Sequence, residues 1–338
     1  MKLLIILVAA ASLGAETRYA VSLTDEGSQA DGLSCPGTPE NCPSEGNLLI
    51  LAPSFSYRDG DRWRFVTNLA GVVTTEGDTH EQLLVKETYF GLSAGDLDFA
   101  VGKKILQWGT GYAFTPTGIL DPPRNPLDPT DHLGLNQGRD MFETDWTTGR
   151  LAFSEVWASA GLLDTHLPGM RETTAFRYNT LIDGFDTSLI VSHDRGGTTF
   201  TGANFTRVFG ESIEVHGEFA KRGSSAALAG GKYTMHNGVG FICEYYSQGT
   251  GHEQFAYLRV AKSRLRELPG WKEWDFDASV VKNLHDGSHI LLANVQRSVG
   301  NHLSFYARAQ VPNGKKWRSE YGMIPYAALV SIGFRVQL

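Results

Sequence analysis

The chain has 338 residues, a formal net charge of −7, three cysteines and 38 glycines, and 11% of its residues are aromatic. The mild acidity argues against a nucleic-acid partner, because such proteins present basic patches. Mean hydropathy is −0.20, and beyond the N-terminus no apolar run approaches the ~18 residues that a membrane helix needs.

A basic start, an apolar run and small residues mark the N-terminus. Met1-Lys2 precedes the unbroken apolar run of residues 3–11, and small residues follow up to Ala15. This pattern predicts a secretory signal peptide over residues 1–15, which is too short to span a bilayer as a helix. We therefore expect a secreted protein whose fold begins after residue 15.

Residues 16–46 are rich in Ser, Gly, Asp and Pro, which predicts an N-terminal arm or surface loop. Cys35 and Cys42 flank a turn-rich segment and could form a disulfide in an oxidising compartment. Metal ligation is the alternative, although two cysteines without a nearby histidine make a poor site. Cys243 lies in an apolar row and is predicted to be a free thiol, either buried or facing lipid.

From residue 47 to the end, strand-length segments with alternating apolar and polar residues recur every ~10–15 residues, separated by turn residues. Over residues 213–219, for example, Ile213, Val215 and Phe219 alternate with Glu214 and Glu218. A soluble sandwich also alternates. The polar face, however, carries charged residues in segment after segment, and the chain starts with a secretion signal, so a transmembrane barrel is favoured.

The last segment, residues 330–338, has the most regular alternation. Phe334, Val336 and Leu338 are in phase on an apolar face, with Arg335 on the polar one. This segment resembles the closing strand of bacterial outer-membrane β-barrels, which the assembly machinery reads, although those strands end in an aromatic residue. We expect an all-β fold: one antiparallel up-and-down barrel of about 14–16 strands, with 12–18 as the range, over residues 47–338.

A long segment at residues 106–136 interrupts the strand pattern. Five of the 13 prolines lie between residues 116 and 129, and proline is excluded from strand interiors. Loop packing is expected from the aromatic residues Trp108, Tyr112 and Phe114. Charges of both signs, with acidic ones in excess, would then lie near the pathway, and an external cap is the alternative. The aspartates could also bind Ca²⁺, but their spacing does not match an EF-hand.

The start of this loop carries a recognisable pattern, composed of Gly102, Lys103, Trp108, Gly109, Gly111, Pro116, Pro126, Asp128 and Pro129. It resembles a motif of porin-like outer-membrane barrels, many of them uncharacterised. Glu244-Tyr245-Tyr246, followed by Gly249 and Gly251, is similar to a later strand of such proteins. The similarity is close over about 30 residues and loose over the rest of the barrel. It implies a long loop that folds into the lumen and narrows the pore.

The expected function is a porin-like channel in the outer membrane for passive diffusion of small hydrophilic solutes. The expected partners are outer-membrane lipids, the barrel-assembly machinery and these solutes, with an oligomer or an envelope protein left open. The alternative is a non-conducting or partner-filled barrel, a scaffold or sheath of an export or electron-transfer complex. Candidates for lining the pore or its constriction are Lys104, Asp121, Arg124, Asp128, Asp131, Glu244, Arg308 and Arg335. No enzyme or cofactor motif is present, so neither catalysis nor a cofactor or metal is expected.

Overall fold

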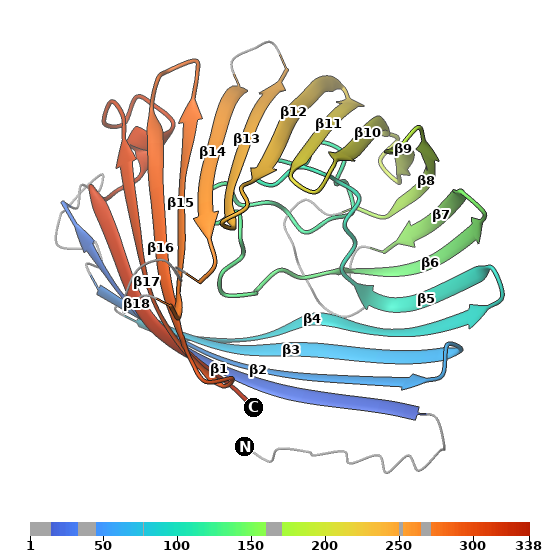
Figure 1. Ribbon diagram of the computed structural model, residues 1–338, viewed down its shortest axis with the longest axis horizontal. Helices are drawn as coiled ribbons and strands as arrows, with labels where there is room; N and C mark the ends of the chain where they lie inside the picture. Colours follow the sequence, from blue (N-terminus) through green and yellow to red (C-terminus); the bar gives the residue numbers. More distant parts are fainter. Residues whose placement is uncertain (1–14, 33–44, 77, 160–170, 250–252, 265–271) are drawn as a thin grey trace.

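The computed structural model describes residues 15–32, 45–76, 78–159, 171–249, 253–264 and 272–338, and these form one closed antiparallel barrel of 18 strands (Figure 1). The strands are β1 (Ala15–Asp31), β2 (Glu45–Asp59), β3 (Trp63–Glu76), β4 (Asp78–Ala94), β5 (Leu97–Lys104), β6 (Arg139–Thr148), β7 (Leu151–Ala158), β8 (Thr173–Ile182), β9 (Phe185–Asp194), β10 (Thr199–Phe209), β11 (Ile213–Arg222), β12 (Ser224–Thr234), β13 (Val239–Gln248), β14 (Glu253–Lys262), β15 (Trp274–Asn283), β16 (His289–Val299), β17 (Leu303–Asn313) and β18 (Ala328–Gln337). A short 3₁₀ helix, η2 (Tyr321–Met323), precedes β18. No helix in this part of the chain is long and apolar enough to cross a membrane.

Closure of the barrel depends on β1, which pairs with β2 on one side and β18 on the other. The expectation of an N-terminal arm over residues 16–46 is therefore wrong for residues 16–31. The sequence pattern missed this strand because Asp25 and Gly27 fall on its outward face, where the other strands carry large apolar residues. The additional strand takes the barrel to 18, above the 14–16 that the sequence favoured and at the limit of its range. Cys35, Cys42 and residues 1–14 of the proposed signal peptide lie outside the described residues.

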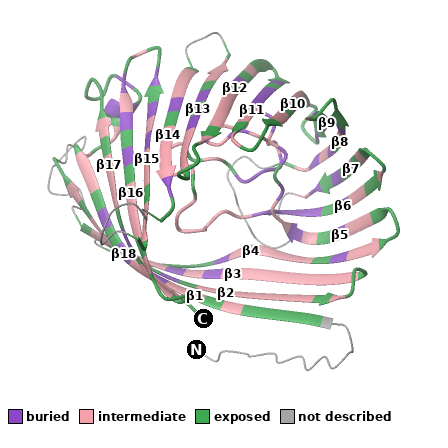
Figure 2. Ribbon diagram, viewed as in Figure 1, coloured by how far each residue is buried: buried purple, intermediate pink, exposed green. Residues whose placement is uncertain are grey.

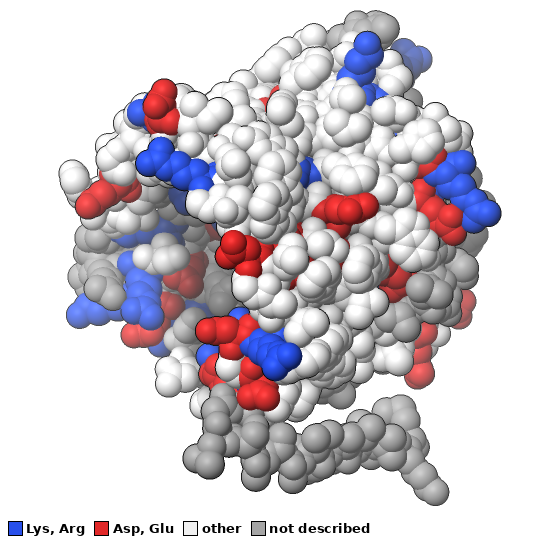
Figure 3. All heavy atoms as spheres, turned by 90° about the vertical axis from the view of Figure 1, so that its right-hand side faces the viewer, with Lys and Arg blue, Asp and Glu red and all other residues white. Residues whose placement is uncertain are grey.

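Buried, intermediate and exposed residues occur together along the strands (Figure 2). Because successive side chains point to opposite faces, the wall is divided into an outer apolar face and an inner face. The predicted closing strand follows this rule: Phe334 pairs with Phe305 on the outer face, while Arg335 points inward and donates to Thr24 Oγ1 at 3.1 Å. On the side of the barrel drawn in Figure 3, uncharged side chains cover most of the surface. An apolar outer wall is what a barrel surrounded by lipid requires.

Aromatic side chains gather on the outer face near the rim that carries the turns after β2, β6 and β8. Ring pairs on adjacent strands run along this rim: Phe55–Phe65, Trp63–Phe90, Trp146–Phe153 and Phe185–Phe205. Outer-membrane barrels have aromatic girdles at the membrane interfaces. These ring pairs are placed as in one such girdle.

Cys243 lies on the outward face of β13, opposite Gly231 on β12 and Leu258 on β14, and its side chain is exposed. In the membrane this thiol faces lipid. We expect a membrane-permeant maleimide to label the folded protein, while a charged maleimide reacts at least about tenfold more slowly, because a charged reagent enters an apolar phase only at a large cost. Mass spectrometry of labelled vesicles measures both rates, and equal rates would place Cys243 in water.

Candidate functional site

Residues 105–138 join β5 to the adjacent β6, yet this loop crosses the lumen to the opposite wall (Figure 1). Its main attachment is Glu218 on β11, six strands from β5 around the barrel. The Glu218 carboxylate accepts hydrogen bonds from the backbone N–H groups of Thr110, Gly111 (2.8 Å) and Thr117 (2.7 Å), and from both threonine hydroxyls. One wall carboxylate thus satisfies backbone donors from two turns of the loop.

A second attachment lies on β13. Glu244, whose side chain is fully buried, accepts from the backbone N–H groups of Tyr112 and Ala113, the latter at 2.9 Å. His216 on β11 contacts the same carboxylate through Nε2 at 3.0 Å. Hydrogen bonds to a charged acceptor each contribute about 1.5–3 kcal/mol. The loop is therefore held firmly at the tip of its crossing.

Asp121 closes the loop on itself. Its carboxylate accepts from the N–H groups of Trp108 (2.7 Å) and Gly109 (3.0 Å), and the residue is only 5% exposed. Burial raises the pKa of Asp121 to about 6, although these two hydrogen bonds act in the opposite direction. The Trp-Gly-x-Gly pattern has a steric reason here, since a Cβ on Gly111 would lie 1.9 Å from the carbonyl oxygen of Phe114.

Three apolar clusters join the loop to the wall. The first contains Trp108 and Leu120 against side chains from β6 to β11, and the second contains Ala113 with Tyr112 and Phe114 against β13 to β16. The third cluster is formed by Leu133 and Leu135 against β2 to β4. The ring of Phe114 also stacks on Tyr246, with centroids 4.6 Å apart. The loop is therefore packed against three separate sectors of the inner wall.

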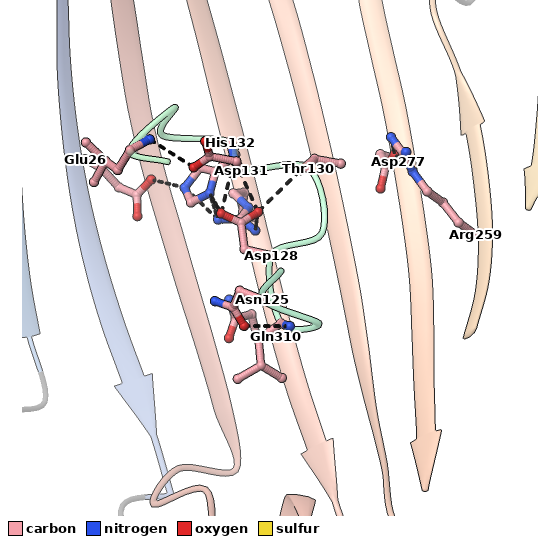
Figure 4. Close-up of polar contacts among 12 residues, drawn as sticks. Glu26, Asn125, Asp128, Thr130, Asp131, His132, Arg259, Asp277 and Gln310 are labelled. Atoms are coloured by element: carbon pink, nitrogen blue, oxygen red, sulfur yellow. Dashed lines mark hydrogen bonds and ion pairs between the residues drawn. The ribbon is translucent and has the colours of Figure 1, made fainter. Parts of the chain in front are cut away.

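The returning part of the loop lies beside the strands that close the barrel (Figure 4). His132 contacts Asp128 through Nδ1 at 2.7 Å and Glu26 of β1 through Nε2 at 3.1 Å. Asp128 also pairs with Arg308 of β17 at 3.1 Å, and Arg335 of β18 donates to the His132 carbonyl oxygen. One loop segment thus bridges β1, β17 and β18.

We expect this bridge to weaken as pH rises. Burial and the Arg308 charge lower the pKa of His132, but the hydrogen bonds to Asp128 and Glu26 raise it more, so the net shift is upward. Because the pKa of His132 is higher in the folded protein than in the unfolded chain, protonated His132 stabilises the fold. This stabilisation is complete below the unfolded pKa of about 6.5 and is lost as the pH rises through the folded pKa. The melting temperature of the wild type should exceed that of His132→Gln by several degrees at pH 6 and by much less at pH 9. A difference that does not change with pH would contradict a charged His132.

The remaining sequence candidates lie apart from these bridges. Lys104 forms an ion pair with Glu143 on the inner wall between β5 and β6. Asp131 has a φ of 45° and accepts from the N–H groups of Leu135 and Asn136, so it shapes a turn within the loop. No group of three potential metal ligands occurs among the described residues, and the three loop aspartates have different neighbours. Whether any of these groups lines a solute pathway stays a prediction.

Sequence reasoning named Glu244 as a pore-lining candidate but missed the other anchoring residues on the wall. Glu218, His216 and Asn204 project from strands that follow the loop by about 100 residues in the chain, and Asn204 Nδ2 donates to Trp108 O at 2.7 Å. The only signal was the charge on the polar side of the segment containing His216 and Glu218, which does not say what these groups contact.

Two cavities flank the loop. One, of about 380 Å³, lies between residues 113–124 of the loop and the wall of β10 to β13. The other, of about 220 Å³, lies between residues 107–112 and β14, where Tyr257 and Arg259 contribute to its lining. Arg124 lines both cavities, and it is half-buried.

A single closed 18-stranded barrel with an apolar outer face and a loop inside the lumen is the fold of outer-membrane porins and channels. Solved structures share this fold: OccK11 (OpdR) of Pseudomonas aeruginosa is 9% identical with a TM-score of 0.64, covering 95% of this chain and 96% of that one. A Rhodopseudomonas blastica porin triple mutant is 11% identical, with a TM-score of 0.55 and coverage of 96% and 100%.

A third similar structure is Wzi of Escherichia coli, described as a carbohydrate-binding β-barrel involved in group 1 capsule assembly. It is 10% identical, with a TM-score of 0.60, and the match covers 94% of this chain and 84% of Wzi. No protein-family model and no curated protein sequence matches the chain. At these identities the likeness establishes the fold, and this fold implies residence in the outer membrane.

Proposed function

We propose that the protein is an outer-membrane channel through which small hydrophilic solutes diffuse passively, with residues 105–138 as its constriction. The observation that supports this most strongly is the attachment of the loop to Glu218 and Glu244 on the far wall. A long loop costs conformational entropy to order, so a loop that is bonded across the lumen is expected to have a role there.

The cavities on both sides of the loop support a restricted rather than a blocked lumen. Their linings include polar groups from Thr115, Ser224 and Gln248 in the larger cavity and from Gln107 and Thr110 in the smaller one. Such groups can replace part of the hydration shell of a solute. No catalytic step is proposed, since diffusion requires only a lined passage.

Planar-bilayer recording tests this function directly. Purified wild-type protein should insert with discrete current steps, and deletion of residues 116–129 should raise the single-channel conductance severalfold, because the constriction is removed. Heat-modifiable gel mobility confirms that both barrels are folded. A folded wild type that passes no current would overturn the channel function, whatever the deletion variant does.

The alternative is a non-conducting barrel that serves as a scaffold or sheath for envelope partners. Packing of the loop against three sectors of the wall favours a non-conducting barrel, because each apolar cluster reduces the open area of the lumen. If the barrel is non-conducting, the same bilayer recording should show no current through the wild type but a current through the deletion variant. Partners of such a barrel would be envelope proteins or surface polymers, to be sought by cross-linking in cells.

A further inference from the structure

The arginine that lines both cavities carries an inference that rests on the proposed channel function. Arg124 lies on the loop between Pro122-Pro123 and Pro126, and these prolines restrict its backbone. Its side chain forms no hydrogen bond or ion pair with any described residue, although it lowers the pKa of nearby Asp121 electrostatically. A guanidinium remains charged at every physiological pH. One fixed positive charge thus faces the space on each side of the loop.

The carboxylates near this space are turned away from it by their contacts. Glu218, Glu244 and Asp121 are between 1% and 5% exposed and accept the backbone N–H groups of the loop. None of the described residues that line either cavity is Asp or Glu. The overall net charge of −7 therefore says little about the charge that a solute would meet beside the loop.

Two further arginines continue the positive lining. Arg222 lines the larger cavity and pairs with Asp194, and Arg259 lines the smaller one and pairs with Asp277 (Figure 4). Each pair is close to neutral as a whole, but its arginine rather than its carboxylate lines the cavity. Arg124 forms no such ion pair with a described residue, and the Asp121 carboxylate that it influences electrostatically is bonded to the backbone of residues 108 and 109. Of the three arginines, Arg124 therefore has the least compensated charge.

We infer that the passage beside the loop selects small anionic solutes, and that Arg124 is the residue that determines this selectivity. The charge acts at a narrow site flanked by protein, where the effective dielectric is lower than in water, so an anion is stabilised there and a cation is repelled. This expectation differs from the sequence-based one, in which acidic loop residues were in excess along the pathway.

Reversal potentials in a tenfold KCl gradient test the inference. The wild type should favour chloride over potassium, Arg124→Gln should lower the chloride-to-potassium permeability ratio by a factor on the order of ten, and Arg124→Glu should favour potassium. Arg124→Lys retains the charge and should retain the anion preference. Arg150→Gln removes the same charge from an exposed turn between β6 and β7 and should leave the ratio unchanged.

The outcomes separate this inference from the proposed function. A wild type that conducts without preferring chloride, or an Arg124→Gln variant that matches Arg150→Gln, overturns the selectivity while the channel stands. A folded wild type that passes no current overturns the channel function, and the selectivity with it. Because residue 124 lies in the loop and not in a strand, heat-modifiable gel mobility should be the same for all four variants.

Discussion

Deletion of Val336-Gln337-Leu338 is expected to abolish assembly, leaving unfolded chain in the periplasm and little or no protein in the outer membrane. These residues provide one end of the barrel seam. Leu338 exchanges two backbone hydrogen bonds with Val21, at 2.9 and 3.0 Å, and Gln337 N donates to His302 O at 2.7 Å. Val336 also pairs with Leu23 of β1. Without them the β1–β18 seam is left with unpaired backbone groups in lipid, each of which costs several kcal/mol.

Cell fractionation and heat-modifiable gel mobility measure this effect. Leu338→Phe keeps the backbone bonds and the apolar outer face, so it should assemble as well as the wild type. Phe334→Lys places a charge on the lipid face and should reduce the amount of assembled protein. The free-energy cost of such a charge is about 2–4 kcal/mol at the membrane midplane and less near the interface. Normal insertion of the truncated chain would contradict the role of residues 336–338 in closing the barrel.

The barrel could be predicted from the sequence because alternation is a local property. Many strands from β2 onward have their own period of two, and the apolar outer face of Phe334, Val336 and Leu338 can be recognised from the local sequence alone. β1 was missed because its alternation is interrupted by Asp25. Its position follows instead from pairing with two neighbours, β2 and β18, which lie far apart in the chain.

The lumen could be predicted only in part. Proline density and the Trp-Gly-x-Gly pattern indicated a shaped loop near Trp108, and its aromatic residues do pack against the wall. What the loop contacts depends on which strands face it across the barrel, and this follows from strand number and register rather than from local pattern. For the same reason the sequence did not reveal that the Asp121 carboxylate accepts hydrogen bonds from the backbone of residues 108 and 109.

Replacement of both wall anchors, Glu218→Ala with Glu244→Ala, is expected to release the loop and raise the conductance severalfold, with frequent current fluctuations. The loop N–H groups of residues 110–113 and 117 would lose their acceptors. A buried donor left without a partner costs about 1–3 kcal/mol, so the loop gains by moving towards water. The apolar clusters would still hold part of it, which accounts for fluctuation rather than a steady open state.

Single replacements should have intermediate effects, because either anchor alone still holds one side of the crossing and the two act on the same loop. Glu211→Ala removes a carboxylate from the exposed turn before β11 and serves as the matched control, with conductance expected to equal that of the wild type. The measurement is the single-channel conductance and its variance in planar bilayers. Only variants whose heat-modifiable gel mobility equals that of the wild type are compared, so that all of them are folded barrels. If the double variant conducts like Glu211→Ala, the carboxylates do not control the position of the loop, and its apolar packing alone must hold it across the lumen.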